Sequence, residues 1–289
     1  MITYKDLQRA ALPTLLMLCF AGPACAKGRL LATGGVTEIE GSAGGGILPW
    51  ALIAGYGTRD EVGATAFFTH LEIDDFRLRS VGVAVGLFDR VELSYARQKF
   101  DLGTTIPDKS IEQDIVGVKV KLIGDAIFDQ NRMLPQIALG AQYKRNRDFD
   151  VAPALLGAKK DSGTDVYISA TKLYLAGLFG RNLLLNGTVR ATKANQLGLL
   201  GFGGDLNDSY RVYFESSAAV FLTDSLAIGV EYRTKPNNLS AFREDNFKDV
   251  FVAYVPNKHV AFTAAYAGLG QIADKQSQRG VYLSIQGSY

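Results

Sequence analysis

The amino-acid sequence indicates an all-β fold: a transmembrane antiparallel up-and-down β-barrel of about fourteen strands, following a cleaved signal peptide. Three features lead to this conclusion: repeated alternation of apolar and polar residues, an export signal at the start of the chain, and a last strand that ends in an aromatic residue. A period of two places successive side chains on opposite faces of a strand. Such strands can cross a bilayer as a closed barrel, because closure leaves no unpaired edge.

The alternation is clearest between Tyr210 and Lys235. Even positions from Tyr210 to Leu222 are mainly apolar, whereas odd positions such as Arg211 and Glu215 are polar. After Thr223 and Asp224 the alternation resumes, so the two runs predict an antiparallel hairpin with a tight polar turn. Each run is about ten residues or slightly longer, which is the length that a tilted strand needs to cross a bilayer.

Residues 1–26 have the pattern of a secretory signal peptide. Lys5 and Arg9 precede an apolar run that ends at Gly22, and Ala24-Cys25-Ala26 supplies the small residues of a cleavage site. The run is too short to be a membrane-spanning helix. Both cysteines of the chain, Cys19 and Cys25, lie in this leader, so we expect no disulfide scaffold, thiolate metal site or cysteine nucleophile in the exported protein.

Charge and length narrow the class of protein further. The net charge of the whole chain is +2, and removing the leader lowers it by one, which gives no support for nucleic-acid binding. No apolar run after the leader approaches the roughly 18 residues of a transmembrane helix. We therefore predict the signal peptide at 1–26, a Gly-rich N-terminal segment at 27–47 that is a first strand or a strap in the lumen, and one outer-membrane β-barrel at 48–289.

Alternation and turn residues divide the exported chain into about fourteen candidate strands. The first two, residues 30–39 and 48–57, are the weakest part of this count, and twelve strands remain if both lie outside the wall. Near Ser80 the apolar positions change phase, which predicts a bulge or the point where the strand leaves the bilayer. The other candidate strands cover residues 62–71, 76–87, 91–100, 111–123, 134–145, 165–178, 183–193, 210–222, 225–233, 249–255, 260–269 and 279–289.

The lengths of the connections agree with a barrel, which has short turns on the periplasmic side and longer loops outside. Short and long connections alternate along the chain, with the short link 72–75 as the exception among the outer loops. The short ones lie at 58–61, 88–90, 179–182, 223–224 and 256–259, with a medium one at 124–133. The long ones lie at 101–110, 146–164, 194–209, 236–248 and 270–278.

The C-terminal strand resembles the signal by which assembly machinery recognises outer-membrane barrels. Val281, Leu283 and Ile285 alternate with polar residues up to the terminal Tyr289. That signal usually ends in Phe, and Gly287 stands where a bulky residue is commoner. The alternative is an ordinary edge strand at the end of the chain.

Two stretches are similar to a proteobacterial family of unassigned function, domain-of-unknown-function family 3034. They are residues 34–46 leading into Pro49-Trp50-Ala51, and residues 86–94 from Gly86 to Ser94. The similarity extends from there to the C-terminus. The resemblance implies an outer-membrane or envelope setting, and because the family has no established activity it assigns no functional residues.

The polar face of the strands gives the candidate lumen-lining residues. If the lumen holds water, their excess of positive charge would favour a narrow passive channel for small hydrophilic solutes, anions among them. If the charges pair across the lumen, the barrel is instead closed and has a structural, surface-binding or envelope-assembly role. The candidates are Lys119, Lys121, Lys144, Arg190, Arg211, Glu215, Glu231, Arg233 and Lys235.

A barrel of fourteen strands lies between those filled by their own side chains and those with a wide aqueous channel. A segment of the chain could therefore block the pore. Two candidates for this plug are the Gly-rich segment from Gly34 to Gly46 and the loop Val151–Ala158, which is unusually apolar for a solvated loop.

The sequence does not predict an enzyme, a cofactor or a metal site. The Gly-rich segment lacks the Gly-Lys-Ser/Thr of a phosphate-binding loop. His70, near Glu72 and Asp74, is the one candidate for a third hypothesis, an outer-membrane hydrolase, although a solvated cluster at the rim explains it as well. The expected partners are outer-membrane lipid, lipopolysaccharide and the barrel-assembly machinery, in the outer membrane of a Gram-negative bacterium, and the sequence carries no signal for one solute or oligomeric state.

Overall fold

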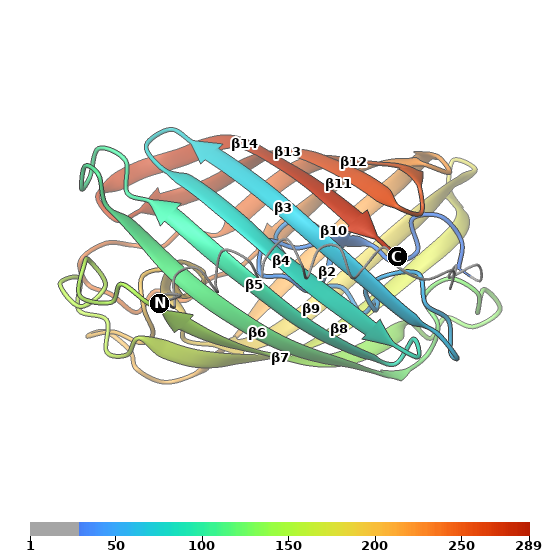
Figure 1. The fold of residues 1–289 in the computed structure, drawn as a ribbon, viewed down its shortest axis with the longest axis horizontal. Helices are drawn as coiled ribbons and strands as arrows, with labels where there is room; N and C mark the ends of the chain where they lie inside the picture. Colours follow the sequence, from blue (N-terminus) through green and yellow to red (C-terminus); the bar gives the residue numbers. More distant parts are fainter. Residues whose placement is uncertain (1–28) are drawn as a thin grey trace, which may run out of the picture.

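The computed structural model describes residues 29–289, so the predicted leader at 1–26 lies outside the described part of the chain. Twelve strands, β3 to β14, form a closed antiparallel barrel in which each strand pairs with the next and β14 pairs with β3 (Figure 1). Their bounds are β3 (Val62–Ile73), β4 (Arg77–Leu87), β5 (Val91–Asp101), β6 (Ser110–Ile123), β7 (Gln136–Asn146), β8 (Ser162–Leu178), β9 (Arg181–Thr192), β10 (Arg211–Thr223), β11 (Leu226–Arg233), β12 (Phe247–Asn257), β13 (Val260–Ile272) and β14 (Lys275–Ser288).

Alternation along each strand separates an outer apolar face from an inner one. On β6, the outward Val116 and Val118 are 55% and 42% exposed, whereas the inward Ile115 and Lys119 are almost fully buried. An exposed apolar wall of this kind suits contact with lipid. Among the described residues, no helix has the length and apolar character needed to cross a membrane.

The prediction of about fourteen wall strands is wrong, and the alternative of twelve is confirmed. Residues 48–57 form no wall strand, and within residues 30–39 only Val36–Thr37 (β1) is a strand, paired with Ala43–Gly44 (β2). We name residues 29–57 the lumen segment, because this chain runs inside the barrel (Figure 1, blue). Its apolar residues face a partly apolar interior. In this segment the apolar alternation therefore reflects internal packing and not contact with lipid.

The two ends of the barrel differ in the length of their connections. One end, the turn end, holds the C-terminus and mostly short links such as 88–90 and 258–259. The other, the loop end, holds the long connections 102–109, 147–161, 193–210 and 234–246. Long loops lie outside the cell in barrels of this type, so we expect the turn end to face the periplasm. The predicted loop 270–278 is wrong, because Ala273 and Asp274 alone separate β13 from β14.

Of the two alternatives predicted near Ser80, the bulge is wrong. β4 pairs with β3 and β5 in unbroken register through Ser80. The apolar residues change phase because Leu78 points inward and is buried in the interior, while Val81 and Val83 point outward. The interior is therefore apolar near the loop end of this strand.

Candidate functional site

The lumen segment enters and leaves the barrel at the turn end. Arg29 donates hydrogen bonds to the carbonyls of Ile53 and Gly55 at 3.1 Å each, which ties the two ends of the segment together. The same guanidinium pairs with Asp89, in the turn between β4 and β5, at 2.7 Å. The segment therefore forms a loop that is anchored at its base and extends into the lumen.

The tip of this loop is a tight turn between β1 and β2. The amide of Gly41 donates to the carbonyl of Glu38 at 2.9 Å, and Gly41 has a φ of 99°, which favours glycine. A Cβ at Gly41 would also lie 3.0 Å from the Cβ of Ala96 in the wall. The turn therefore needs glycine for both its conformation and its close approach to β5.

Glu40 at the tip lies in a buried cluster of alternating charges. Its carboxylate pairs with Lys144 and, at 2.8 Å, with Arg233. Two wall carboxylates complete the cluster: Asp165 lies 2.7 Å from Lys144, and Glu215 lies 2.6 Å from Arg190 and 3.2 Å from Arg233. We name these six residues, three cations and three carboxylates from β7 to β11 and the lumen segment, the Glu40 cluster.

A second ion pair binds the backbone of the lumen segment. Lys119 and Glu92 lie 3.1 Å apart and are each 1% exposed. Lys119 donates to the carbonyls of Ala43 and Trp50 at 2.8 and 3.1 Å, and Glu92 accepts from the amide of Ala54 at 2.9 Å. Both side chains therefore satisfy backbone groups that would otherwise be buried without partners.

Other polar wall residues do the same for the returning half of the segment. Glu231 accepts from the amides of Gly46 and Ile47 at 2.8 and 2.9 Å. The carbonyl of Pro49 accepts from the hydroxyl of Thr188 at 3.0 Å, among other donors of β8 and β9. The inner face is therefore complementary to an irregular chain, whose backbone needs partners from outside itself.

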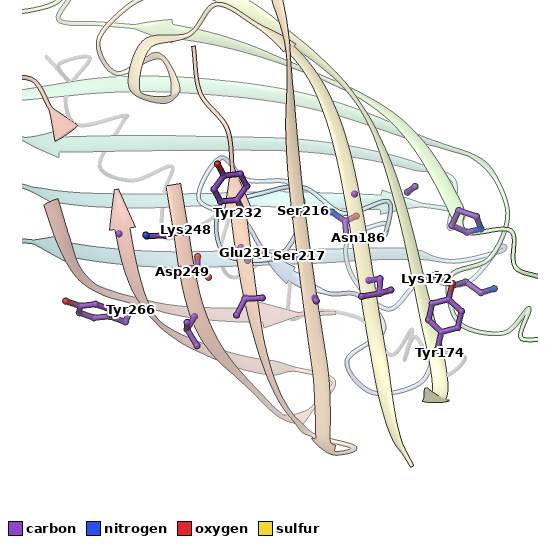
Figure 2. Close-up of a pocket in the computed structure, with 18 of the residues that line it drawn as sticks. Lys172, Tyr174, Asn186, Ser216, Ser217, Glu231, Tyr232, Lys248, Asp249 and Tyr266 are labelled. Atoms are coloured by element: carbon purple, nitrogen blue, oxygen red, sulfur yellow. The ribbon is translucent and has the colours of Figure 1, made fainter. Parts of the chain in front are cut away.

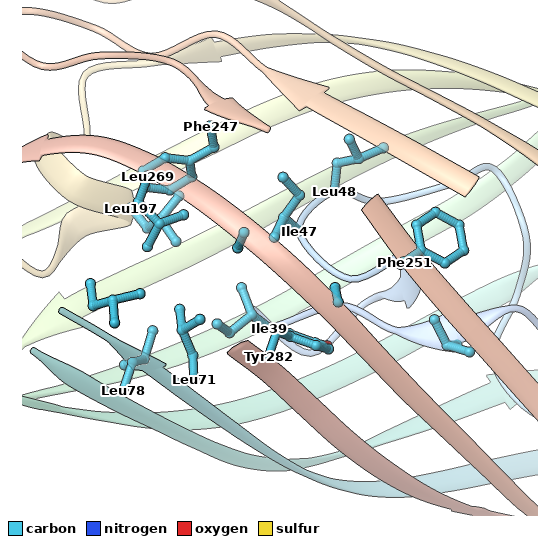
Figure 3. Packing of buried hydrophobic residues seen from close by; sticks show 14 of the residues in the cluster. Ile39, Ile47, Leu48, Leu71, Leu78, Leu197, Phe247, Phe251, Leu269 and Tyr282 are labelled. Carbon is cyan, nitrogen blue, oxygen red and sulfur yellow. The ribbon is translucent and has the colours of Figure 1, made fainter. Parts of the chain in front are cut away.

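The opposite side of the lumen, near the loop end, is apolar. Ile39 and Ile47 of the lumen segment pack in one buried cluster with wall residues including Leu71 and Leu78 (Figure 3). An enclosed void of about 30 Å³ lies among them. Ile39 and Glu40 are consecutive residues, yet Ile39 faces this apolar side and Glu40 faces the charged wall residues of the Glu40 cluster.

The structure brings most of the predicted lumen residues together inside the barrel. Eight of them are buried, and each contacts the lumen segment, a connection between strands, or another inward charge. These eight are Lys119, Lys121, Lys144, Arg190, Glu215, Glu231, Arg233 and Lys235. Lys121 pairs with Asp89 at 2.7 Å, and Lys235 lies 3.4 Å from Glu244. The exception is Arg211, which is exposed because it is the first residue of β10 at the loop end.

Sequence reasoning missed four inward carboxylates. Asp165 begins the inward face of β8, whose register shifts after Tyr174 and so obscured its phase. Asp249 lies on the inward face of β12. Glu38 and Glu40 belong to a Gly-rich stretch that we expected to be flexible or strap-like, and their spacing by two residues was the signal that both could face one side of an extended chain.

His70 lies on the outward face of β3 and not in the lumen. Its Nε2 is 3.6 Å from the carboxylate of Glu72, which also pairs with Arg77 at 2.8 Å. Within residues 29–289, no hydrogen bond joins His70 to a serine, threonine or tyrosine side chain, and no group of three metal-binding residues is close enough to hold an ion. The arrangement is that of a charged cluster on the outer surface.

A surface hollow of about 980 Å³ is bordered mainly by outward-facing positions of β8 to β14 (Figure 2). Small residues such as Gly187, Ser216 and Ala218 lie along it, and Tyr232 and Tyr266 are among its larger side chains. Most of these side chains lie on the lipid-facing surface, while the inward-facing Asn186, Ser217, Glu231 and Asp249 form the rest of the lining.

The predicted assembly signal lies at the closure of the barrel. Val281, Leu283 and Ile285 point outward and are between 46% and 51% exposed. Tyr289 exchanges two backbone hydrogen bonds with Ala64, at 2.8 and 2.9 Å, and so continues the pairing of β14 with β3. Its position is therefore that of a residue that completes the wall.

Comparison with solved structures gives likenesses to two porins and to one outer-membrane protein. The NanC porin has a TM-score of 0.50 at 8% identity, over 78% of this chain and 98% of that one. The KdgM porin has 0.49 at 9%, over 78% and 99%, and Omp33 of Acinetobacter baumannii has 0.45 at 11%, over 80% and 100%. At such identities the likeness to NanC concerns the fold alone.

Sequence comparison supports the resemblance noted above. A comparison with curated proteins finds no match. The profile of one family matches residues 33–286, which is most of the chain and includes the lumen segment from Thr33 onward. The chain therefore belongs to the family described as "Protein of unknown function (DUF3034)".

Proposed function

We propose that this protein is an outer-membrane channel for small hydrophilic solutes that its own lumen segment holds closed. The observation that carries the proposal is the Glu40 cluster, in which ion pairs attach the lumen segment to the wall. Buried ion pairs contribute little net stability compared with apolar packing of the same volume, because both charges lose their hydration. Water can therefore replace the wall as the partner of the charged side at moderate cost, whereas the apolar packing of Ile39 opposes release of the segment.

The polar side of the wall supports the choice of hydrophilic solutes. Once the lumen segment leaves, Lys119, Lys144, Arg190 and Arg233 would face water together with carboxylates of the wall. The anion preference that the sequence favoured is weaker, because Asp165 and Asp249 add negative charge to the same face. We therefore expect an open lumen with little selectivity between anions and cations.

Planar-bilayer recordings test this proposal with three forms of the protein. Deleting residues 29–57 should produce large, steady conductance, while the full-length barrel should be closed with rare openings. A disulfide between Ala54→Cys and Ala84→Cys, two alanines in one buried contact cluster, should abolish these openings. Reduction of the same sample should restore them, which provides the matched control.

A closed barrel with a structural or envelope-assembly role is the second candidate. The many hydrogen bonds from wall side chains to the backbone of the lumen segment favour it, because each would have to be exchanged for water. If the deletion conducts but the reduced full-length protein never opens at any applied voltage, the closed barrel is correct. If the folded deletion is also silent, no channel function remains.

We expect the outer face to contact lipopolysaccharide and the C-terminal strand to be recognised by the assembly machinery. Lys248 and Arg279 flank Gly268 across three paired strands near the loop end, and the Lys248 side chain lies over Gly268. Two cations at this height suit the phosphates of lipopolysaccharide in the outer leaflet. We expect Lys248→Glu with Arg279→Glu to reduce lipopolysaccharide that copurifies with the barrel, and deletion of Tyr289 to slow its insertion by the assembly machinery.

A further inference from the structure

A third cavity, of about 260 Å³, lies among the loops of the loop end, outside the closed part of the lumen. Phe76 and Phe100 form one side, with ring centroids 5.2 Å apart, and Leu200 and Phe242 from two long loops form another. All four side chains are no more than 6% exposed. We name this cavity the apolar groove.

The apolar stretch 151–158, which sequence analysis singled out as a plug, borders this groove instead of entering the lumen. Val151, Ala152 and Leu156 line it, while Leu155 stands at its border and is 82% exposed. A concave, mainly apolar surface with few polar groups is typical of sites that bind small molecules.

The polar groups of the groove define the charge of its ligand. Its lining includes no lysine, arginine or histidine, and its polar members are Thr105 and Asp274, whose side chains are 3.2 Å apart. Asp274 also lies 3.7 Å from Lys275, so that cation is already engaged outside the lining. A carboxylate ligand would find no positive partner here, and burying it unpaired would be costly.

The groove is close to the tip of the lumen segment. Phe100 and Ile272 line both the groove and the enclosed void of about 30 Å³. Ile39 borders that void from the other side. The groove and Ile39, the residue next to Glu40, are therefore in contact with the same two side chains.

We propose that the apolar groove binds a small neutral apolar molecule, of the size of a single aromatic ring with short substituents, from the outer side of the membrane. The volume is slightly below the roughly 300 Å³ at which pockets for drug-sized ligands begin, which suits a ligand of this size. A hydroxyl on the ligand could donate to Asp274 at the edge. The site is independent of the proposed channel, because binding requires no opening of the lumen.

Fluorine NMR of the folded barrel in lipid nanodiscs tests the proposal with two probes, fluorobenzene and 4-fluorobenzoate. Empty nanodiscs measure partition into lipid. We expect saturable binding of fluorobenzene, and affinity at least about ten-fold weaker for 4-fluorobenzoate because its charge has no partner. Absence of saturable binding, or equal binding of the two probes, would overturn the proposal.

Two substitutions locate the binding in the groove. Ala241→Trp fills it from an exposed lining position and should weaken fluorobenzene binding about ten-fold or more, because the cavity is lost. Ser240→Trp, the neighbouring exposed residue outside the lining, is the matched control and should leave affinity unchanged. Leu155→Asp, at a position that is 82% exposed, should also weaken binding. Equal effects of Ala241→Trp and Ser240→Trp would place the probe elsewhere and refute the site.

Discussion

The two sides of the lumen near the loop end hold the same segment by different forces. Strands β7 to β11 present the Glu40 cluster, where every side chain is charged. Strands β3, β4, β5 and β13 present apolar side chains to Ile39. Charged contacts can be replaced by hydration, whereas apolar contacts lose free energy on exposure. The charged side therefore positions the segment, and the apolar side stabilises it.

The largest effect should come from breaking the charged side at one partner. Arg233→Leu leaves Glu40 and Glu215 with one cation fewer in a buried site, which should cost about 3–5 kcal/mol. Trp50, the single tryptophan of the chain, belongs to the lumen segment and is 6% exposed, so it reports release of the segment. Urea titration of its fluorescence in lipid vesicles measures the loss.

Two controls sharpen this result. Arg77→Leu breaks a pair with Glu72 on the exposed outer face and should not change the Trp50 transition. Glu40→Gln combined with Arg233→Leu should cost less than Arg233→Leu alone, because it removes the orphaned charge as well. A double variant that is as unstable as the sum of the two single variants would argue against pairing as the cause.

A smaller effect is expected from the apolar side. Ile39→Ala should cost about 2–4 kcal/mol, because the removed methyl groups enlarge a void that the wall cannot close. The loss should appear in the same Trp50 titration and should be insensitive to salt. An Ile39→Ala loss equal to that of Arg233→Leu and equally sensitive to salt would remove the distinction between the two sides.

The smallest effect concerns Lys235, which lies between the two sides. It pairs with Glu244 at 3.4 Å and sits 3.8 Å from the ring of Phe247. Burial lowers the pKa of Lys235 from 10.5 to about 8, against the opposing effect of Glu244. Between these values the unfolded chain binds more protons than the folded one, so the stability contributed by this residue rises with pH.

Lys235→Met should therefore flatten the stability profile between pH 8 and 10.5. Equilibrium unfolding of the folded barrel at several pH values in this window checks the prediction. Lys275→Met, at a more exposed loop-end position, is the control and should retain the rise. A rise that persists in Lys235→Met would assign the pH dependence to another group.

Most of the wall could be predicted from sequence, because lipid on one side of a strand imposes a period of two. The interior could not, because the same period arises when apolar residues face inward. Leu78 shows this on β4, and Leu48 and Leu52 show it in the lumen segment, where they produced one of the two surplus wall strands, residues 48–57.

The candidate site was predictable only in part. The cations Lys144, Arg190 and Arg233 were identified by their positions on the inner face. Their shared partner, Glu40, was not identified. Glu40 lies more than a hundred residues before Lys144 in the sequence, and the chain reversal at Gly41 brings it to these cations. Which charges pair across a lumen depends on the path of the chain inside it, and no alternation encodes that path.

Quenching of Trp50 by acrylamide in the folded, full-length barrel tests the central claim most directly. If residues 29–57 fill the lumen, quenching should be weak in lipid vesicles and should become strong when urea unfolds the protein. Quenching that is as strong in the folded barrel as in the unfolded chain would place the segment in water, and the lumen would then be closed by something else or not closed at all.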